Sequence, residues 1–151
     1  MIKTDQSIHN ICIAAIKRHT TQPYDFKWTR FYADKDAFIH HYPQMIPDLS
    51  EKEWPICSTI IDAYSWSVLT TRRLLTNQQG QLTMANIDTS ISQSHGDFKG
   101  DDKKDRTLGI LQLANGTRMT YFIETGKASM VMIYGIRTRI NITKQEAFSG
   151  Q

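Results

Sequence analysis

Apolar and polar residues follow two different periods along the chain, and the change falls near residue 58. Before that point the apolar residues recur with helical spacing, which predicts a first helix from Ser7 to His19, capped by Asp5 or by Ser7 itself. A second helix is predicted from Asp34 to Met45, with its first residue as the cap. Residues 50–53 have the Ser-x-x-Glu form of a capping box and predict a further short turn of helix.

Beyond residue 58, β-branched and aromatic residues become frequent. Strands are predicted over residues 59–64 and 66–76, followed by a turn at 77–80. Residues 83–91 alternate with the two-residue period of a half-buried strand. The clearest strand pair is a hairpin over residues 108–123, because Asn-Gly at its centre readily adopts the positive φ angles that tight turns demand.

Residues 127–141 fit two structures. One set of their apolar residues lies on a single helical face, whereas Ile136, Thr138 and Ile140 also alternate with polar residues as in a strand. We favour the helix, because Thr125 can supply its cap and because alanine and methionine favour helix over sheet.

Helices that precede strands, rather than alternating with them, are typical of the α+β class. We therefore expect one domain over residues 1–151, mainly helical over 1–57 and mainly antiparallel β over 58–142. In it, N-terminal helices pack on an antiparallel sheet or partly open barrel of five to seven strands, and a C-terminal helix completes the fold. Five apolar residues are the strongest core candidates: Trp66, Leu69, Ile87, Leu111 and Ile123.

Composition limits the class of protein. Of the 151 residues, 40% are hydrophobic and 22% are charged, which is typical of a globular chain with a single core. The net charge of +3 is lower than that of dedicated nucleic-acid binders, so no nucleic-acid partner is expected. No run of residues is long and apolar enough for a transmembrane helix, and the polar N-terminal residues do not resemble a signal peptide.

The two cysteines and five histidines favour a cytoplasmic, metal-free protein. Cys12 and Cys57 lie in apolar surroundings that suit a reducing compartment, although spacing alone leaves one disulfide open. No HExxH or CxxC motif occurs, and the adjacent His40 and His41 cannot ligate one metal ion from a helix. We expect the histidines at the surface or at helix ends, with no bound metal or cofactor.

Motifs for nucleophilic catalysis and nucleotide binding are missing, since the chain has no GxSxG, Walker A or GxGxxG sequence. We therefore assign no catalytic residue and expect a protein that is not an enzyme. One enzymatic alternative stays open, a metal-independent ribonuclease. In it, His95 would transfer protons, and Lys99, Lys103 and Arg106 would bind phosphate.

An aromatic-rich segment, residues 24–32, is the main candidate for a binding surface. It carries Trp28, Arg30 and Phe31, and large aromatic and arginine side chains dominate the binding energy of protein interfaces. The same aromatic side chains would also serve as a lid over one end of the core. Further candidate contacts are cationic, namely Arg72, Lys99, Lys103 and Arg106.

Two stretches resemble the bacterial pleckstrin-homology-like domains. Residues 64–75, YSWSVLTTRRLL, resemble a strand of these domains that leads past a turn into further antiparallel strands, and they place Arg72 and Arg73 in mid-strand. Residues 111–124 and the amphipathic segment after them resemble the last hairpin and the capping helix. The resemblance covers about residues 58–141. It implies an antiparallel sheet, a C-terminal helix, and a ligand that is a protein, a peptide or a lipid.

Three functions are compatible with these observations, because a fold alone does not choose among them. The leading hypothesis is a non-enzymatic protein-binding module of bacterial type, for example an immunity protein that neutralises a toxin domain. The second is an anionic-lipid or phospholigand binder of pleckstrin-homology type, which uses Lys99, Lys103, Lys104 and Arg106 and binds anionic membranes weakly. The third is the ribonuclease-like enzyme described above.

Overall fold

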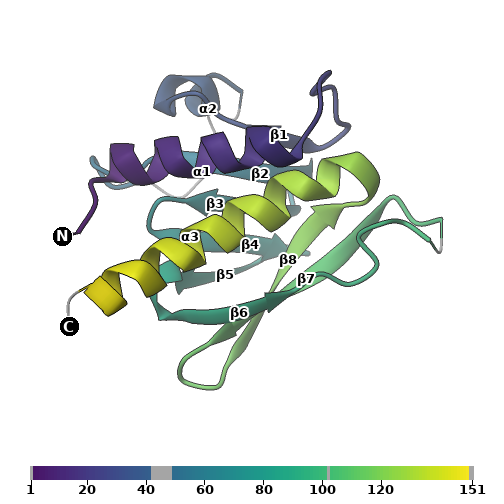
Figure 1. Cartoon of the computed structure of the whole chain (residues 1–151). Coiled ribbons are helices and arrows are strands. Elements are labelled where there is room, and N and C mark those ends of the chain that lie inside the picture. The colour runs from purple at the N-terminus through teal and green to yellow at the C-terminus, as the bar shows by residue number, and fades with distance from the viewer. Residues whose placement is uncertain (1, 42–48, 102, 150–151) are drawn as a thin grey trace.

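The computed structural model describes residues 2–41, 49–101 and 103–149, and within them the chain has the expected α+β architecture (Figure 1). Two long helices and two antiparallel sheets make up most of it. In chain order the elements are α1 Asp5–His19, β1 Thr29–Phe31, α2 Lys35–His41, β2 Pro55–Asp62, β3 Ser65–Thr70, β4 Arg73–Gln78, β5 Gln81–Asn86, η1 Ile87–Thr89, β6 Ser90–Ser94, β7 Arg106–Leu113, β8 Arg118–Glu124, η2 Gly126–Ala128 and α3 Ser129–Ser149.

The strands form two sheets. Five make a meander in the order β1-β2-β3-β4-β5, and three more follow in the order β6-β7-β8. The sheets meet where β8 crosses the longer sheet, and there the main-chain N–H of Phe122 donates to the buried Oγ of Ser67 over 2.8 Å. The seven described strands from β2 to β8 agree with the predicted number, although they are divided between two sheets.

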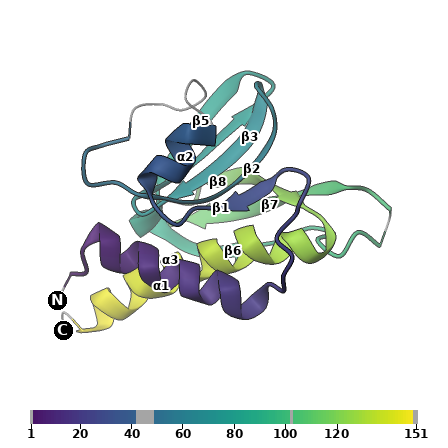
Figure 2. The same ribbon diagram turned by 90° about the horizontal axis from the view of Figure 1, so that it is seen from above.

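Helices α1 and α3 lie side by side on one face of the sheets (Figures 1 and 2). Between these helices and the sheets lies the main core, where Ile16 of α1, Leu69 of β3 and Ile136 of α3 are fully buried. Gly135 permits the close approach of α3 to β2, because a Cβ there would lie 2.9 Å from the Sγ of Cys57. The apolar stripe of each helix is thus matched to the sheet surface below it.

A smaller cluster fills the opposite face of the five-stranded sheet, where Phe38 of α2 packs with Tyr32 and Trp66. Because both faces are covered, β2 is buried from Pro55 to Ile60 and lacks the polar alternation of a half-exposed strand. All five core candidates are confirmed as buried: Trp66 in this cluster, and Leu69, Ile87, Leu111 and Ile123 in the main core.

The N-terminal helices differ from the prediction at their ends. Thr4, and neither Asp5 nor Ser7, caps α1, because its Oγ1 accepts an N–H of the first turn over 3.1 Å. Asp34 caps α2 as predicted. The described helix ends at His41, and residues 42–45 of the predicted helix lie outside the described residues. Of the predicted capping box at residues 50–53, one bond forms: the N–H of Ser50 donates to the carboxylate of Glu53 over 3.2 Å. The N–H of Glu53 donates instead to the main-chain carbonyl of Ser50, which closes a turn, and no helix follows because β2 starts at Pro55.

Two predicted strands are interrupted. The predicted strand 66–76 is β3 and β4, which turn at Thr71 and Arg72, so the arginines are not in mid-strand. The predicted strand 83–91 contains η1, a 3₁₀ turn at which the chain passes from one sheet to the other. Alternation does not reveal such breaks, because the residues on both sides keep the same period. The pattern also fails to predict β1, since three residues are too few to show a period.

The C-terminal predictions are confirmed. Strands β7 and β8 form the hairpin, and Gly116 in its turn has a φ of 90°. Residues 129–149 are a helix, longer than predicted. Thr125 is not its side-chain cap, because its Oγ1 instead donates to the carbonyl of Lys104 over 2.7 Å. Both cysteines are free and buried.

Candidate functional site

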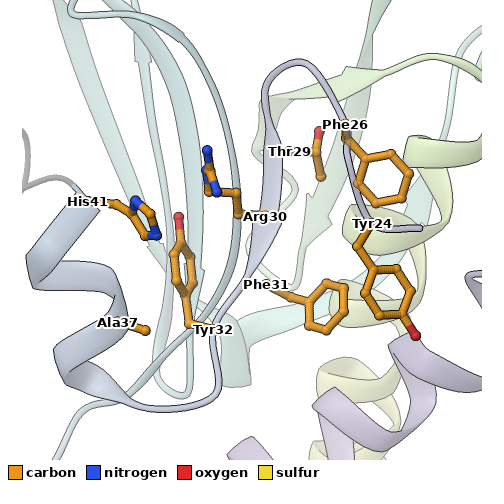
Figure 3. A pocket seen from close by; sticks show the side chains of 8 residues that line it. All are labelled: Tyr24, Phe26, Thr29, Arg30, Phe31, Tyr32, Ala37 and His41. Carbon is orange, nitrogen blue, oxygen red and sulfur yellow. The ribbon is translucent and has the colours of Figure 1, made fainter. Parts of the chain in front are cut away.

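Several predicted binding residues lie along β1, at one edge of the five-stranded sheet. A cleft of about 190 Å³ opens there beside the segment that leads into β1 and beside α2 (Figure 3). Aromatic, polar and cationic side chains line it together: Tyr24, Phe26, Thr29, Arg30, Phe31, Tyr32, Ala37 and His41. The structure thus brings Arg30 and Phe31 to one cleft, as the aromatic-rich segment suggests.

Successive residues of β1 point to opposite sides of the strand (Figure 3). Tyr32, directly after β1, is buried, and its hydroxyl lies 2.5 Å from the Oγ of Ser58. Thr29 is also buried, whereas Arg30 is exposed and Phe31 is half-buried. The strand is therefore held by Thr29 and Tyr32 and leaves Arg30 and part of Phe31 accessible to solvent.

The aromatic rings before and within β1 are partly buried and partly exposed. Tyr24 and Phe31 meet edge to face, with ring centroids 4.9 Å apart, and both rings are half-buried. Phe26 and Phe31 also pack against the main core. The segment is therefore a lid whose outer side remains an accessible aromatic surface.

A buried histidine that the sequence analysis does not single out holds the end of β1. His9 of α1 is only 2% exposed, and its Nε2 lies 2.7 Å from the carbonyl oxygen of Tyr32. Because a carbonyl can only accept, Nε2 carries the proton. The prediction that the histidines lie at the surface or at helix ends is wrong for His9. The spacing of His9, Cys12 and Ile16 puts all three residues on one helical face. This spacing is the feature of the sequence that indicates the burial of His9.

Glu124, at the end of β8, anchors the start of β1. Its carboxylate accepts the main-chain N–H groups of Lys27 and Trp28 over 3.0 and 2.8 Å. It also accepts the hydroxyl of Thr29 over 2.9 Å. Three donors thus converge on one carboxylate, and hydrogen bonds to a carboxylate are among the stronger ones in proteins. The backbone that carries Trp28 is therefore held in place by the second sheet.

Trp28 lies between two cations. The Nζ of Lys27 is 4.5 Å from the centroid of the indole ring, and the Cζ of Arg106 is 5.6 Å from it. Both distances suit cation–π attraction. Trp28 and Arg106 are candidates from separate parts of the sequence, and the structure unites them in one surface. Nothing in the sequence indicates this pairing, because it depends on β1 and β7 starting close together in space.

The basic loop before β7 continues this surface. Lys103, Lys104 and Arg106 line a shallow hollow, and Asp105 lies among them. The carboxylate of Asp105 is 3.9 Å from the ammonium of Lys27, and both side chains are exposed. Lys99 is placed differently, with its Nζ 6.0 Å from the ring of Phe98. The loop thus carries both positive and negative side chains and is not a uniformly basic surface.

Arg72 is not part of the β1 surface. It lies in the β3–β4 turn, and its Nε and Nη2 both donate to the carboxylate of Asp5 over 3.0 Å. Arg73 makes an equivalent pair with Glu53, over 2.9 and 3.0 Å. The prediction that the two arginines lie in mid-strand is therefore wrong. Each is bound to a carboxylate from a segment outside the β3–β4 hairpin, so the pair has a structural role.

The same turn is tied to α3 by a buried arginine. Arg139 is 3% exposed, and its Nε donates to the carbonyl of Thr71 over 2.7 Å. Its Nη2 donates to Asp88 in η1 over 2.8 Å. A buried guanidinium needs such partners, because burial of an unpaired charge is costly. Arg139 therefore connects α3 with the β3–β4 turn and with η1, the two places where a predicted strand is interrupted.

Two carboxylates of this network have perturbed acidities. Burial by itself would raise the pKa of Glu53, but hydrogen bonds from Arg73 and Thr70 outweigh it and hold the pKa below its ordinary value of 4.5. For Asp5, burial likewise acts to raise the pKa, and hydrogen bonds from Arg72 and Thr71 bring it below its ordinary value of 3.8. Both carboxylates are therefore ionised at neutral pH.

His95, the residue of the ribonuclease alternative, lies against α3. Its Nε2 is 3.4 Å from the Nη2 of Arg137, and its ring meets Phe98 edge to face. Burial, and then the charge of Arg137, lower the pKa of His95. Among the described residues, no hydrogen bond or ion pair joins His95 to Lys99, Lys103 or Arg106. The four proposed residues are thus not assembled by direct contacts.

Within the described ranges, no group of three or more His, Cys, Asp or Glu side chains is arranged to hold a metal ion. In that part of the chain, no helix combines the length and the apolar character needed to cross a membrane. No metal ligand is assigned.

No protein-family model, no curated protein and no solved structure matches this chain. Its function is therefore inferred from its own geometry. Two features are most informative about function. They are the two cations close to the ring of Trp28 and the half-exposed aromatic cleft along β1.

Proposed function

We propose that the chain is a protein-binding module and that its contact surface is formed by Trp28, Arg30, Phe31 and Arg106. The observation that carries the proposal is the union of half-buried aromatic rings with exposed guanidinium groups on one rigid edge of the fold. Interface energy concentrates in such aromatic and arginine anchors, surrounded by a polar rim. Glu124 supports the surface from behind, so little ordering is needed on binding.

Alanine substitutions of Trp28 and Arg30 test this proposal. Affinity purification from the native host identifies the partner, and calorimetry then measures its affinity for each variant. We expect each substitution to weaken binding by more than ~1 kcal/mol, with a nearly unchanged melting temperature. Phe148→Ala is the matched control, because this side chain is 80% exposed and belongs to the last turn of α3. A large loss of melting temperature with unchanged affinity would make the segment a lid only.

In its finer form, the proposal identifies the partner as a bacterial toxin domain whose active site the module covers. The small size of the chain and the lack of recognisable catalytic motifs support this form. The test is inhibition of the purified partner by the chain at equal molar amounts. Inhibition that Trp28→Ala abolishes would support it, and full partner activity in the complex would contradict it.

One observation favours a second candidate function, an anionic phospholigand binder of pleckstrin-homology-like fold. The two antiparallel sheets and the C-terminal helix are compatible with that fold. Lys103, Lys104 and Arg106 share one hollow, and the Cζ of Arg106 lies 5.6 Å from the ring centroid of Trp28. Pelleting with vesicles that contain anionic lipid is the test, and binding should fade as salt is added. Equal pelleting with neutral vesicles would exclude this function.

A further inference from the structure

Strand β5 is an open edge of the five-stranded sheet and lacks the usual protection of such edges (Figure 1). Proteins commonly shield edge strands by shortness, charged side chains, proline or bulges. At the opposite edge, β1 is only three residues long. β5 has six residues, QLTMAN, with no charge and no proline, and its register with β4 is continuous from Gln81 to Asn86.

The main-chain groups of alternate β5 residues face away from the sheet. The N–H of Ile87 donates to the carbonyl of Arg72 over 2.9 Å, which fixes the phase of the β4–β5 ladder. Bonded and non-bonded pairs alternate in an antiparallel ladder, so the N–H and C=O groups of Leu82 and Met84 point outward. Within the described part of the chain, these groups have no main-chain partner. They form a template for one more strand.

A groove follows this edge. It has a volume of about 350 Å³, and its two walls are β5 and the β7–β8 hairpin, which contributes Leu113, Arg118 and Met119. The side chains of Leu82 and Met84 on β5 are 41% and 54% exposed, and that of Met84 also lines the groove. Arg118 is the one charged residue that lines the groove among the described residues. The lining is therefore mixed: Met84, Ala85, Leu113 and Met119 supply its apolar part among glutamine and threonine side chains, and Arg118 supplies a single cation.

We infer that β5 binds an extended segment of a partner protein, which adds to the sheet as a sixth strand. Main-chain bonds to Leu82 and Met84 would provide affinity, an apolar side chain of the segment would enter the groove, and an acidic one would face Arg118. A second copy of this chain fits less well, because it would bring another Arg118 to the joint and no acidic lining residue. This surface is separate from the β1 cleft. The inference rests on the proposed function in one respect, that the partner is a protein.

The probe is a pool of synthetic peptides that alternate valine with threonine and carry one aspartate, followed by fluorescence anisotropy and amide hydrogen exchange. We expect binding in the micromolar to millimolar range and slower exchange of the Leu82 and Met84 amides. Met84→Pro removes one outward N–H but no bond to β4, so it should weaken binding at least about tenfold. Met84→Leu is the matched control, which keeps both the N–H and an apolar side chain and should change affinity less than about threefold.

Charge reversal provides a second variant. Arg118→Glu should weaken binding of the aspartate peptide and strengthen binding of the same peptide with lysine in place of aspartate. If Met84→Pro does not fold, the exchange data on the unmodified chain and the Arg118→Glu result still decide the inference. Three results would overturn the inference. They are absence of binding at millimolar peptide, binding without protection of the two amides, and a dimer that protects these amides without peptide. Trp28→Ala should leave peptide binding unchanged, so failure here is distinct from failure of the β1 surface.

Discussion

The carboxylate of Glu53 accepts both the Nε and the Nη2 of Arg73, and the side chain of Glu53 is only 2% exposed. The same carboxylate accepts the hydroxyl of Thr70 over 2.5 Å. This bidentate pair joins the segment before β2 to the first residue of β4 and so fixes the turn between β3 and β4. A planar fork of donors against a carboxylate gives both energy and geometric specificity.

We expect Glu53→Ala to lower the free energy of unfolding by about 3 kcal/mol, because it leaves the guanidinium of Arg73 partly buried without its carboxylate. Arg72→Ala is the matched control. The side chain of Arg72 is 45% exposed, so loss of its pair with Asp5 should cost at most about 1 kcal/mol. Urea unfolding of both variants measures the difference. Equal losses of unfolding free energy in the two variants would show that the burial of the Glu53–Arg73 pair does not add to stability.

Stability should fall in acid through the same two carboxylates. The pKa values of Asp5 and Glu53 are lower in the folded chain than their ordinary values of 3.8 and 4.5. Between the lowered and the ordinary pKa, the unfolded chain binds more protons, so stability rises with pH there. Their contribution is therefore complete above about pH 5 and is lost as pH falls through the folded pKa values. Urea midpoints measured from neutral to acid pH should show this loss, and Glu53→Gln should reduce its slope.

Both native thiols should be unreactive. Burial raises the pKa of Cys12 to about 12 and that of Cys57 well above its ordinary value. Since the thiolate is the reactive form, a thiol reagent at mildly alkaline pH should label the folded chain slowly and the unfolded chain at once. Tyr64→Cys is the control, because that position is 68% exposed and should react immediately. Rapid labelling of two thiols in the unmodified folded chain would contradict the burial.

Gly109 of β7 should not tolerate a side chain. A Cβ at this position would lie 2.3 Å from the ring of Tyr121 on the neighbouring strand, and that ring is fully buried. Gly109→Ala should therefore destabilise the chain by about 1–3 kcal/mol, which thermal or urea unfolding measures. Combining it with Tyr121→Ala removes the clash, so the double variant should lose less stability than the sum of the two single losses. Strict additivity would show that the two residues do not interact.

Local patterns predicted the parts of the fold that depend on neighbours in sequence. The hairpin over β7 and β8 follows from Asn115-Gly116 alone, and the helix after it follows from propensity and spacing. The five core candidates are buried because each is an apolar residue on the inner face of a periodic segment, and that face packs against the rest of the fold. By contrast, the two chain reversals at Thr71-Arg72 and at η1 interrupt segments of constant period, and the pattern treats each as a single strand.

The sequence by itself determined the α+β class, the terminal hairpin and helix, and the residues of the core, since periodicity and turn chemistry act over a few residues. Only the tertiary structure decided what the polar residues do. It separated Arg72 from the candidate surface by pairing it with Asp5, and it placed Arg106 over Trp28. It also left β5 open beside Arg118. Such contacts join residues far apart in the chain, and they depend on distances of a few ångströms that only the packed sheets and helices set.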